Sequence, residues 1–182
     1  MTEKDMAKMI QDDPWMMTIL KTTREVNLPD WWIGAGFVRS KVWDFLHGHT
    51  QRTAIPDIDV IYFDKNNTSE SSEKTVENKL HSVLPEIKWS VKNQARMHTL
   101  HNDEPYRNAT EGLSRWVETA TCIGVRLEIH ETLLISAPHG IGDLTQLILR
   151  PTPNTNNSIE LFYKRINDKN WLEKWPRLKL AI

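Results

Sequence analysis

The sequence is poor in the features that define several protein classes. It contains one cysteine, Cys122, so no disulfide can form within the chain and we expect this thiol to pack as a small buried side chain. No apolar run approaches the roughly 20 residues that a membrane-spanning helix needs. The first ten residues, MTEKDMAKMI, are too acidic and too broken in their apolar pattern for a signal peptide. We therefore expect a cytoplasmic protein with no membrane partner.

The chain also has little net charge. Its 23 Lys and Arg residues and 24 Asp and Glu residues are mixed along the sequence, and the formal net charge is -1. No overall basic field attracts nucleic acid regardless of its sequence, which excludes a DNA packaging role. With 182 residues, 39% of them hydrophobic, the chain is long enough for one domain with a real core. We expect one domain over residues 1–182, with a core from 13 to 150 and a C-terminal helical extension from 158 to 182.

Hydrophobic spacing predicts a mixed α/β chain. The expected fold is α/β (α+β), a short central mixed sheet flanked by helices, with further helices at the C-terminus. Residues 98–107 and 151–158 are predicted to be loops, and most of the eight tryptophans are predicted to pack in the core. Helices are expected over residues 14–26, 37–47, 75–84, 112–121, 141–149 and 159–172, and strands over 31–34, 57–64, 87–91, 123–129 and 133–136.

Glycine is scarce, with only seven in the chain, yet two stand in the segment WWIGAGFVRS. Gly34 and Gly36 fall where an apolar strand pattern meets a helix pattern. Without a Cβ, such a turn lets a phosphate approach the backbone N–H groups at a helix N-terminus. Arg39 is a candidate to point back over this turn toward a phosphate, and the alternative is a solvated charge on the helix.

Two acidic residues lie two positions apart in the segment DIDVIYFD. If a strand includes both, Asp57 and Asp59 leave the same face, roughly 6 to 7 Å apart along the backbone. Two carboxylates on one face of an apolar strand repel each other, and a divalent cation such as Mg²⁺ relieves that repulsion. The alternative is a strand that begins at Ile58 or Val60, which leaves Asp57 as a solvated loop residue.

These motifs together resemble a known superfamily. The glycine turn, the helix after it and the acidic strand about twenty residues later are similar to the nucleotidyltransferase superfamily of the polymerase β type. Further segments are similar, in the same order, to a bacterial branch often called DUF925, and the resemblance covers roughly residues 14–179. Its most specific parts are WSVKNQARMH and RWVETAT, and the other parts are LPDWWIGAGFVRSKVWDFLHG, PDIDVIYFD, APHGIGDL and KRINDKNWLEKWPRL.

The resemblance implies a nucleotidyltransferase fold and a Mg²⁺ site. In that fold Gly34 and Gly36 lie under the triphosphate of a nucleoside triphosphate (NTP), and Asp57 and Asp59 are catalytic metal ligands. The family context also favours a nucleotide-binding role for two polar residues of WSVKNQARMH, which are Asn93 and Arg96.

The superfamily scheme needs a third carboxylate from a later strand, and this chain departs from it. The corresponding strand, Trp89–Asn93, contains no acid. Glu118 in RWVETAT and Glu128 in VRLEI are the candidate substitutes, and Glu118 is preferred because its surroundings are polar and shared with the family. Its role is to bind a second metal ion or to deprotonate the acceptor.

Two functions remain open from the sequence. The first is a Mg²⁺-dependent nucleotidyltransferase that moves a nucleoside monophosphate from an NTP to an unidentified acceptor hydroxyl on a small molecule, a protein or an RNA end. The second is a catalytically inactive nucleotide-binding sensor or interaction module of the same fold. A zinc hydrolase built on histidines is disfavoured, because neither His47 with His49 nor His98 with His101 supplies enough ligands.

Overall fold

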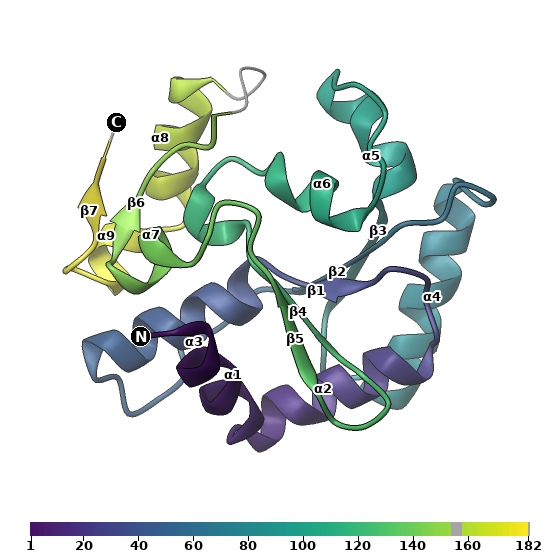
Figure 1. Ribbon diagram of the computed structural model, residues 1–182, viewed down its shortest axis with the longest axis horizontal. Coiled ribbons are helices and arrows are strands. Elements are labelled where there is room, and N and C mark those ends of the chain that lie inside the picture. The colour runs from purple at the N-terminus through teal and green to yellow at the C-terminus, as the bar shows by residue number, and fades with distance from the viewer. Residues whose placement is uncertain (154–157, 182) are drawn as a thin grey trace.

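The computed structural model describes residues 1–153 and 158–181. Within these ranges no helix is both long and apolar enough to cross a membrane. Figure 1 shows a central sheet with helices packed around it. The helices are α1 (Glu3–Gln11), α2 (Pro14–Glu25), α3 (Gly36–His47), α4 (Glu70–Val83), α5 (Gln94–His101), α6 (Ala109–Ser114), the 3₁₀ helix η1 (Thr119–Thr121), α7 (Gly142–Thr145), α8 (Ile159–Asp168) and α9 (Trp171–Lys174); the strands are β1 (Trp32–Ile33), β2 (Ile58–Tyr62), β3 (Trp89–Asn93), β4 (Gly124–Leu127), β5 (Leu133–Ser136), β6 (Ile148–Leu149) and β7 (Lys179–Leu180).

Five strands form the central mixed sheet, in the order β3-β2-β1-β4-β5. Strand β1 is antiparallel to both β2 and β4, and β2 is parallel to β3. The expected fold class is confirmed. Strands β1 and β2 are neighbours, because Ile33 pairs with Val60 across the sheet. The β4–β5 hairpin covers one edge, as its alternating pattern predicts. A separate pair, β6 and β7, joins the C-terminus to the rest of the fold.

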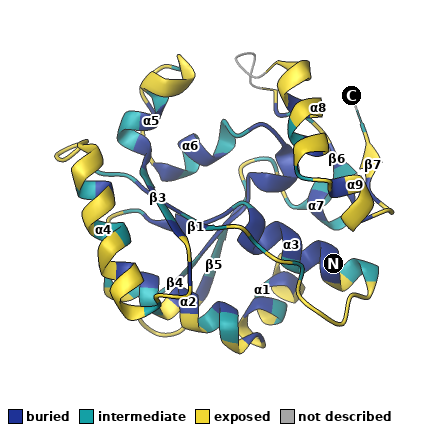
Figure 2. Ribbon diagram, turned by 180° about the vertical axis from the view of Figure 1, so that it is seen from behind, coloured by how far each residue is buried: buried dark blue, intermediate teal, exposed yellow. Residues whose placement is uncertain are grey.

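The core contains most of the tryptophans, and it reaches into the C-terminal helices. Trp43 on α3 packs edge-on against Trp171 and Trp175, with ring centroids 5.7 and 5.0 Å apart. All three side chains are almost completely buried, as the dark faces of α3 and α9 in Figure 2 illustrate. Cys122 is fully buried as expected. Trp116 differs, because it stays partly exposed in the wall of a cavity.

Two helices were not expected from the sequence. Helix α1 begins with a capping box, in which the Thr2 hydroxyl accepts from the Asp5 amide and the Asp5 carboxylate accepts from the Thr2 amide. The Thr-x-x-Asp spacing is the signal that identifies it. Helix α5 replaces a predicted strand end and loop, because Asn93 caps its first turn. Its polar sequence gives no amphipathic pattern.

Other boundaries differ in smaller ways. Helix α6 occupies 109–114 in place of the predicted 112–121, and the segment predicted as a helix over 141–149 splits into α7 and β6. In the second case Leu147 has a positive φ of 61°, which ends the helix and starts the strand that pairs with β7. Part of the predicted loop 151–158, residues 154–157, lies outside the described ranges.

Candidate active site

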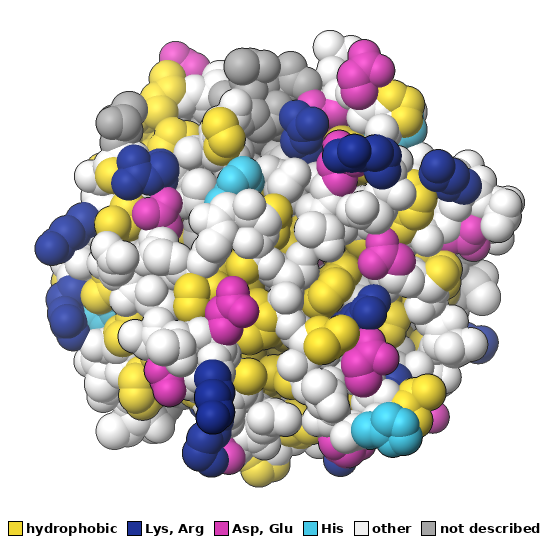
Figure 3. Space-filling model, viewed as in Figure 1, with side chains coloured by type: hydrophobic (Ala, Val, Ile, Leu, Met, Phe, Trp, Pro, Cys, Tyr) yellow, Lys and Arg dark blue, Asp and Glu magenta, His cyan; other side chains and the backbone are white. Residues whose placement is uncertain are grey.

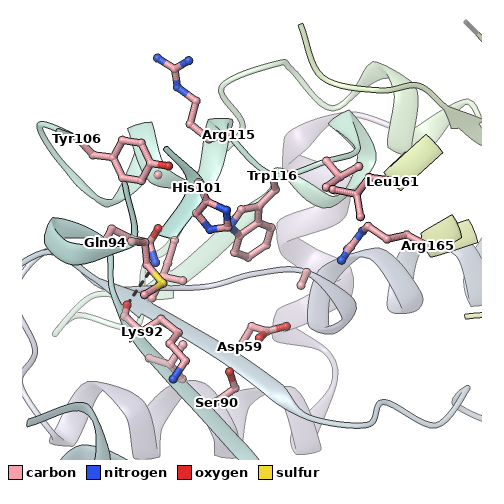
Figure 4. Close-up of a pocket in the computed structure, with 16 residues that line it drawn as sticks. Asp59, Ser90, Lys92, Gln94, His101, Tyr106, Arg115, Trp116, Leu161 and Arg165 are labelled. Atoms are coloured by element: carbon pink, nitrogen blue, oxygen red, sulfur yellow. Dashed lines mark hydrogen bonds between the residues drawn. The ribbon is translucent and has the colours of Figure 1, made fainter. Parts of the chain in front are cut away.

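A cavity of about 350 Å³ opens above the central sheet. Its floor carries Asp59 from β2 with Ser90 and Lys92 from β3, and its walls come from α5, α6, the segment after α6, and α8. In Figure 4, Asp59 and Ser90 lie together at the bottom, Arg165 reaches in from the α8 side, and Trp116 stands between the walls. Ala35, between the two glycines, also lines the cavity. The cavity therefore lies where the predicted turn and the acidic strand meet.

The glycine turn is a tight reversal between β1 and α3. The Phe37 amide donates to the Gly34 carbonyl oxygen over 3.2 Å, and the Gly34 amide donates to the Asp59 carbonyl oxygen over 3.1 Å. The second bond ties the turn to β2, so the turn and the acidic strand adjoin. Ala35, not a glycine, takes the positive φ of 51° with ψ -123°. These angles and the closing bond match a type II′ turn, in which that position favours glycine.

The two glycines are needed for space. A Cβ on Gly34 would lie 3.0 Å from the ring of Trp116, and one on Gly36 would lie 3.2 Å from the side chain of Ile55. Gly34 therefore lets the cavity wall close over the turn. The sequence pattern indicated phosphate access alone as the reason for these glycines, and that role stays a prediction.

Of the two acids, Asp59 lies on strand β2 and Asp57 precedes it. Strand β2 begins at Ile58, so Asp57 lies just before it, and Asp59 faces Ser90 across the β2–β3 pair. Burial, and secondly the charge of Asp57, raise the pKa of Asp59 to about 6, against the hydrogen bond from Ser90 and the charges of Lys169 and Arg39. The charge of a bound cation offsets both the desolvation of Asp59 and its repulsion from Asp57, so the chemistry of this pair fits a divalent metal ion.

Arg39 is buried and is not the solvated helix charge that the alternative interpretation describes. Only 7% of it is exposed, and its guanidinium lies 4.5 Å from the ring centroid of Trp171 and 5.3 Å from that of Trp43. Its Nε is buried without a hydrogen-bond partner. Burial lowers the pKa of Arg39 to about 10, and the nearby Glu118 carboxylate opposes this change. The side chain therefore remains a cation at neutral pH.

Glu118, the predicted third acid, is paired with Arg165. It is completely buried, its Oε1 accepts from Arg165 Nε over 2.6 Å, and its Oε2 accepts from the Thr121 hydroxyl over 3.0 Å. Among the described residues, no three His, Cys, Asp or Glu side chains are grouped so that they could hold a metal ion. The structure thus does not bring Glu118 together with Asp57 and Asp59 as a third ligand.

Asn93 and Arg96 lie beside the cavity but do not line it. Arg96 forms a two-pronged ion pair with the buried Glu73, with bonds of 3.1 and 2.7 Å. Asn93 is fully buried, accepts from Ala95 N and Asp64 N, and donates through its amide nitrogen to two backbone carbonyls. The Arg96 side chain joins α5 to α4, and the Asn93 side chain joins the end of β3 to the segment before α4 and to the start of α5. Their nucleotide-binding role stays a prediction.

The sequence reasoning missed two wall residues, Trp116 and Arg165. Trp116 belongs to RWVETAT and Arg165 belongs to KRINDKNWLEKWPRL, so both lie inside segments that carry the family resemblance. The signal that identifies them is membership of these segments. The first histidine pair makes structural contacts: His47 Nδ1 contacts the Trp43 carbonyl oxygen and His49 Nδ1 contacts Asp44. Of the second pair, His98 packs edge-on against Tyr106 and His101 lines the cavity.

The sequence and the fold of this chain are similar to those of known proteins. The nucleotidyltransferase family matches the chain over residues 21–180. A solved structure whose description says that it reveals a CCA-adding enzyme head domain is 31% identical, with a TM-score of 0.85 over 98% of this chain and 95% of that one. No curated protein matches the chain significantly.

Larger solved enzymes share the fold at lower identity. A Thermotoga maritima CCA-adding enzyme complexed with tRNA is 17% identical, with a TM-score of 0.60 over 96% of this chain and 42% of that one. A CCA-adding enzyme in complex with CTP is 14% identical, with a TM-score of 0.59 over 96% of this chain and 43% of that one. The chain thus spans less than half the length of these two enzymes.

Proposed function

Because the chain belongs to the nucleotidyltransferase family, we propose that it transfers a nucleoside monophosphate from a Mg²⁺-bound NTP to an acceptor hydroxyl. The observation that carries the proposal is the contact between the glycine turn and the acidic strand. A 3.1 Å backbone hydrogen bond joins Gly34 to Asp59 at the edge of a cavity with room for a ligand. One arrangement thus combines a helix N-terminus for phosphate with carboxylates for a cation.

The residues of the cavity have distinct tasks in this proposal. Asp57 and Asp59 hold the metal ion, and Ser90 faces Asp59 from the neighbouring strand. The turn from Gly34 to Gly36 admits the phosphates to the N-terminus of α3, beside the buried cation of Arg39. When bound, Mg²⁺ neutralises phosphate charge and favours departure of pyrophosphate.

The reaction itself is an in-line displacement. The acceptor hydroxyl oxygen forms a bond to the α-phosphorus, the bond from that phosphorus to the bridging oxygen of the β-phosphate breaks, and pyrophosphate leaves with those electrons. The hydroxyl proton passes to water. The acceptor classes that the sequence leaves open, a small molecule, a protein or an RNA end, are alternatives within this reaction.

A second candidate function is nucleotide binding without transfer, as in a sensor or an interaction module. It is favoured by the position of Glu118, whose carboxylate is paired with Arg165, and by the absence of a three-ligand metal cluster among the residues that the structure describes. Binding needs only the turn, the acidic pair and the neighbouring cations. Transfer also needs a group that positions and deprotonates the acceptor.

One set of measurements tests binding and transfer separately. Calorimetric titration with ATP, with and without Mg²⁺, is expected to give metal-dependent binding that Asp59→Asn abolishes. Asp12→Asn, at an exposed acid that pairs with Lys8, is the matched control and is expected to bind as the wild type does. ATP binding by Asp59→Asn at wild-type strength contradicts the proposed site. A screen for pyrophosphate release with small-molecule, protein and RNA acceptors then separates the enzyme from the binding module.

A further inference from the structure

We propose that Arg165, on the C-terminal helix α8, binds a phosphate group of the nucleotide, and that the buried Glu118 is its positioning residue. This inference rests on the proposed function and extends it, because it makes the C-terminal helices part of the nucleotide site. It also gives Glu118 a role other than the third acid that the sequence suggests.

The location of Arg165 supports a direct contact with the ligand. Arg165 lines the cavity together with Asp59, Ser90 and Lys92, although it belongs to a different part of the chain. Figure 4 shows its guanidinium extending from α8 toward the centre of the cavity. The side chain is about one-third exposed, so its charged end is accessible to a ligand that enters.

Glu118 fixes the guanidinium from behind. Its Oε1 is 2.6 Å from Arg165 Nε and its Oε2 is 3.4 Å from Nη2, so the carboxylate lies along one edge of the planar guanidinium. The Thr121 hydroxyl donates to Oε2 and holds the carboxylate in turn. A guanidinium has five N–H donors, and in the described part of the chain Nη1 of Arg165 has no hydrogen-bond partner. Donors remain for an oxyanion in the cavity.

Charge in this wall is unbalanced in favour of an anion. Glu118 is near two guanidinium groups, that of Arg165 and that of the buried Arg39, and all three interact electrostatically. Asp59 also interacts with Arg39, so the excess positive charge of two cations against Glu118 arises once a metal ion neutralises Asp59. A nucleotide whose phosphates reach this wall supplies the missing negative charge, and a planar guanidinium suits phosphate oxygens in particular.

The competing explanation is that the Glu118–Arg165 pair only stabilises the fold. A buried ion pair contributes little net stability, because each charge loses its hydration, and an uncharged pair of similar volume is often as stable. This difference gives a way to separate the two roles. A double variant without either charge retains the fold and loses only the phosphate ligand.

The experiment measures binding of inorganic tripolyphosphate and of ATP, each with Mg²⁺, by calorimetry alongside thermal unfolding. The double variants Glu118→Gln/Arg165→Met and Glu118→Gln/Arg165→Gln remove both charges of the pair, and Asp59 remains as a charge partner of the buried Arg39. The second variant keeps a hydrogen-bonding pair if the first folds poorly. Loss of a charged hydrogen-bond donor is expected to weaken both ligands about ten- to a hundredfold. Lys164→Ala removes a cation from the exposed neighbouring position of α8 and is expected to bind within twofold of wild type.

The role of Glu118 has a readout of its own. If it acts through Arg165, Glu118→Gln weakens tripolyphosphate binding in the wild-type background and has no further effect once Arg165→Met is present. An equal effect in both backgrounds contradicts the positioning role. Binding of tripolyphosphate by either double variant within twofold of wild type overturns the assignment of Arg165 and leaves the proposed function intact. If the wild-type protein binds neither ligand, the proposed function and this inference are both rejected.

Discussion

At the scale of single residues, Ala35 is where the backbone conformation conflicts most with the side chain. Its φ of 51° and ψ of -123° favour glycine, and an L-residue with such angles costs about 1–3 kcal/mol. Two hydrogen bonds, from Phe37 to Gly34 and from Gly34 to Asp59, hold the turn in this form. Strain of this kind is concentrated at ligand sites, which agrees with its place in the cavity wall.

Ala35→Gly is therefore expected to stabilise the protein by about 1 kcal/mol, because relief of the strain exceeds the entropy that glycine adds to the unfolded chain. Thermal unfolding should show the midpoint about 2–4 °C higher. Ala7→Gly, the same change inside helix α1, is the control and should destabilise by up to about 1 kcal/mol. A lower midpoint for both variants would mean that Ala35 is not strained.

Asp59 gives a second expectation for one residue, in the pH dependence of stability without metal. Its pKa in the folded state is about 6, above the value of about 3.9 in an unfolded chain. Below pH 4 the Asp59 carboxyl is neutral in both the folded and the unfolded state, so it does not change the free energy of unfolding. As the pH rises from 4 through 6, the unfolded state ionises first, so the folded protein loses up to about 3 kcal/mol of stability.

Asp59→Asn removes this loss, so the variant should match wild type near pH 4 and exceed it above pH 6. Chemical unfolding in the presence of EDTA, measured at several pH values, checks the difference between the two proteins. A difference that does not change between pH 4 and 7 would show that the carboxylate titrates normally. Added Mg²⁺ is expected to stabilise wild type more than the variant.

At the scale of the elements, the segments that sequence alone identified are those with strong local patterns. The β2 sequence is β-branched and aromatic, the β4–β5 hairpin alternates, and α3 follows a helical stripe. Helix α5 has no such pattern. Interactions with α4 stabilise it instead. The Glu73 carboxylate on α4 accepts from the backbone N–H of Asn93 and from the Arg96 guanidinium, and its side chain is almost completely buried. That partner lies about twenty residues away and cannot be read from the local sequence.

Glu73→Gln should therefore destabilise the junction of α4, β3 and α5 by about 3 kcal/mol, since it leaves a largely buried guanidinium short of its main partner. Chemical unfolding measures the loss. Glu70→Gln removes the second, exposed partner of Arg96 and should cost less than about 1 kcal/mol. Equal effects of the two substitutions would mean that the buried contact contributes no more than the exposed one.

At the scale of the whole molecule, the features that sequence missed are the contacts between distant segments. The glycine turn and the acidic pair are short motifs, so their residues could be chosen from the sequence. Glu118 was chosen for its acidity, but its role depends on Arg165, which is 47 residues away on α8. The surface charge agrees with the mixed charges of the sequence, because Figure 3 shows Lys and Arg side chains interspersed with Asp and Glu side chains on the face that it presents.

The C-terminal helices share one hydrophobic core with the rest of the fold. The sequence separates a core from a C-terminal extension, yet Trp175 packs 5.0 Å from Trp43 and its Nε1 donates to Asp44 over 2.8 Å. Trp175→Ala should therefore cost about 3–5 kcal/mol. Trp175→Phe keeps a ring and loses the hydrogen bond, for about 1–3 kcal/mol. Unfolding followed by both tryptophan fluorescence and circular dichroism should remain a single transition.

The control for this prediction is Leu172→Ala on the exposed side of α9, which should cost less than about 1 kcal/mol. If Trp175→Ala is as mild as this control, or if fluorescence changes before circular dichroism, residues 158–182 form a separable appendage. A single transition with a large loss means instead that α8, which carries Arg165, is fixed by the same core as α3, which begins at the glycine turn. The two sides of the proposed nucleotide cavity then form and unfold together, so a substitution at Trp175 weakens ligand binding only as far as it unfolds the protein.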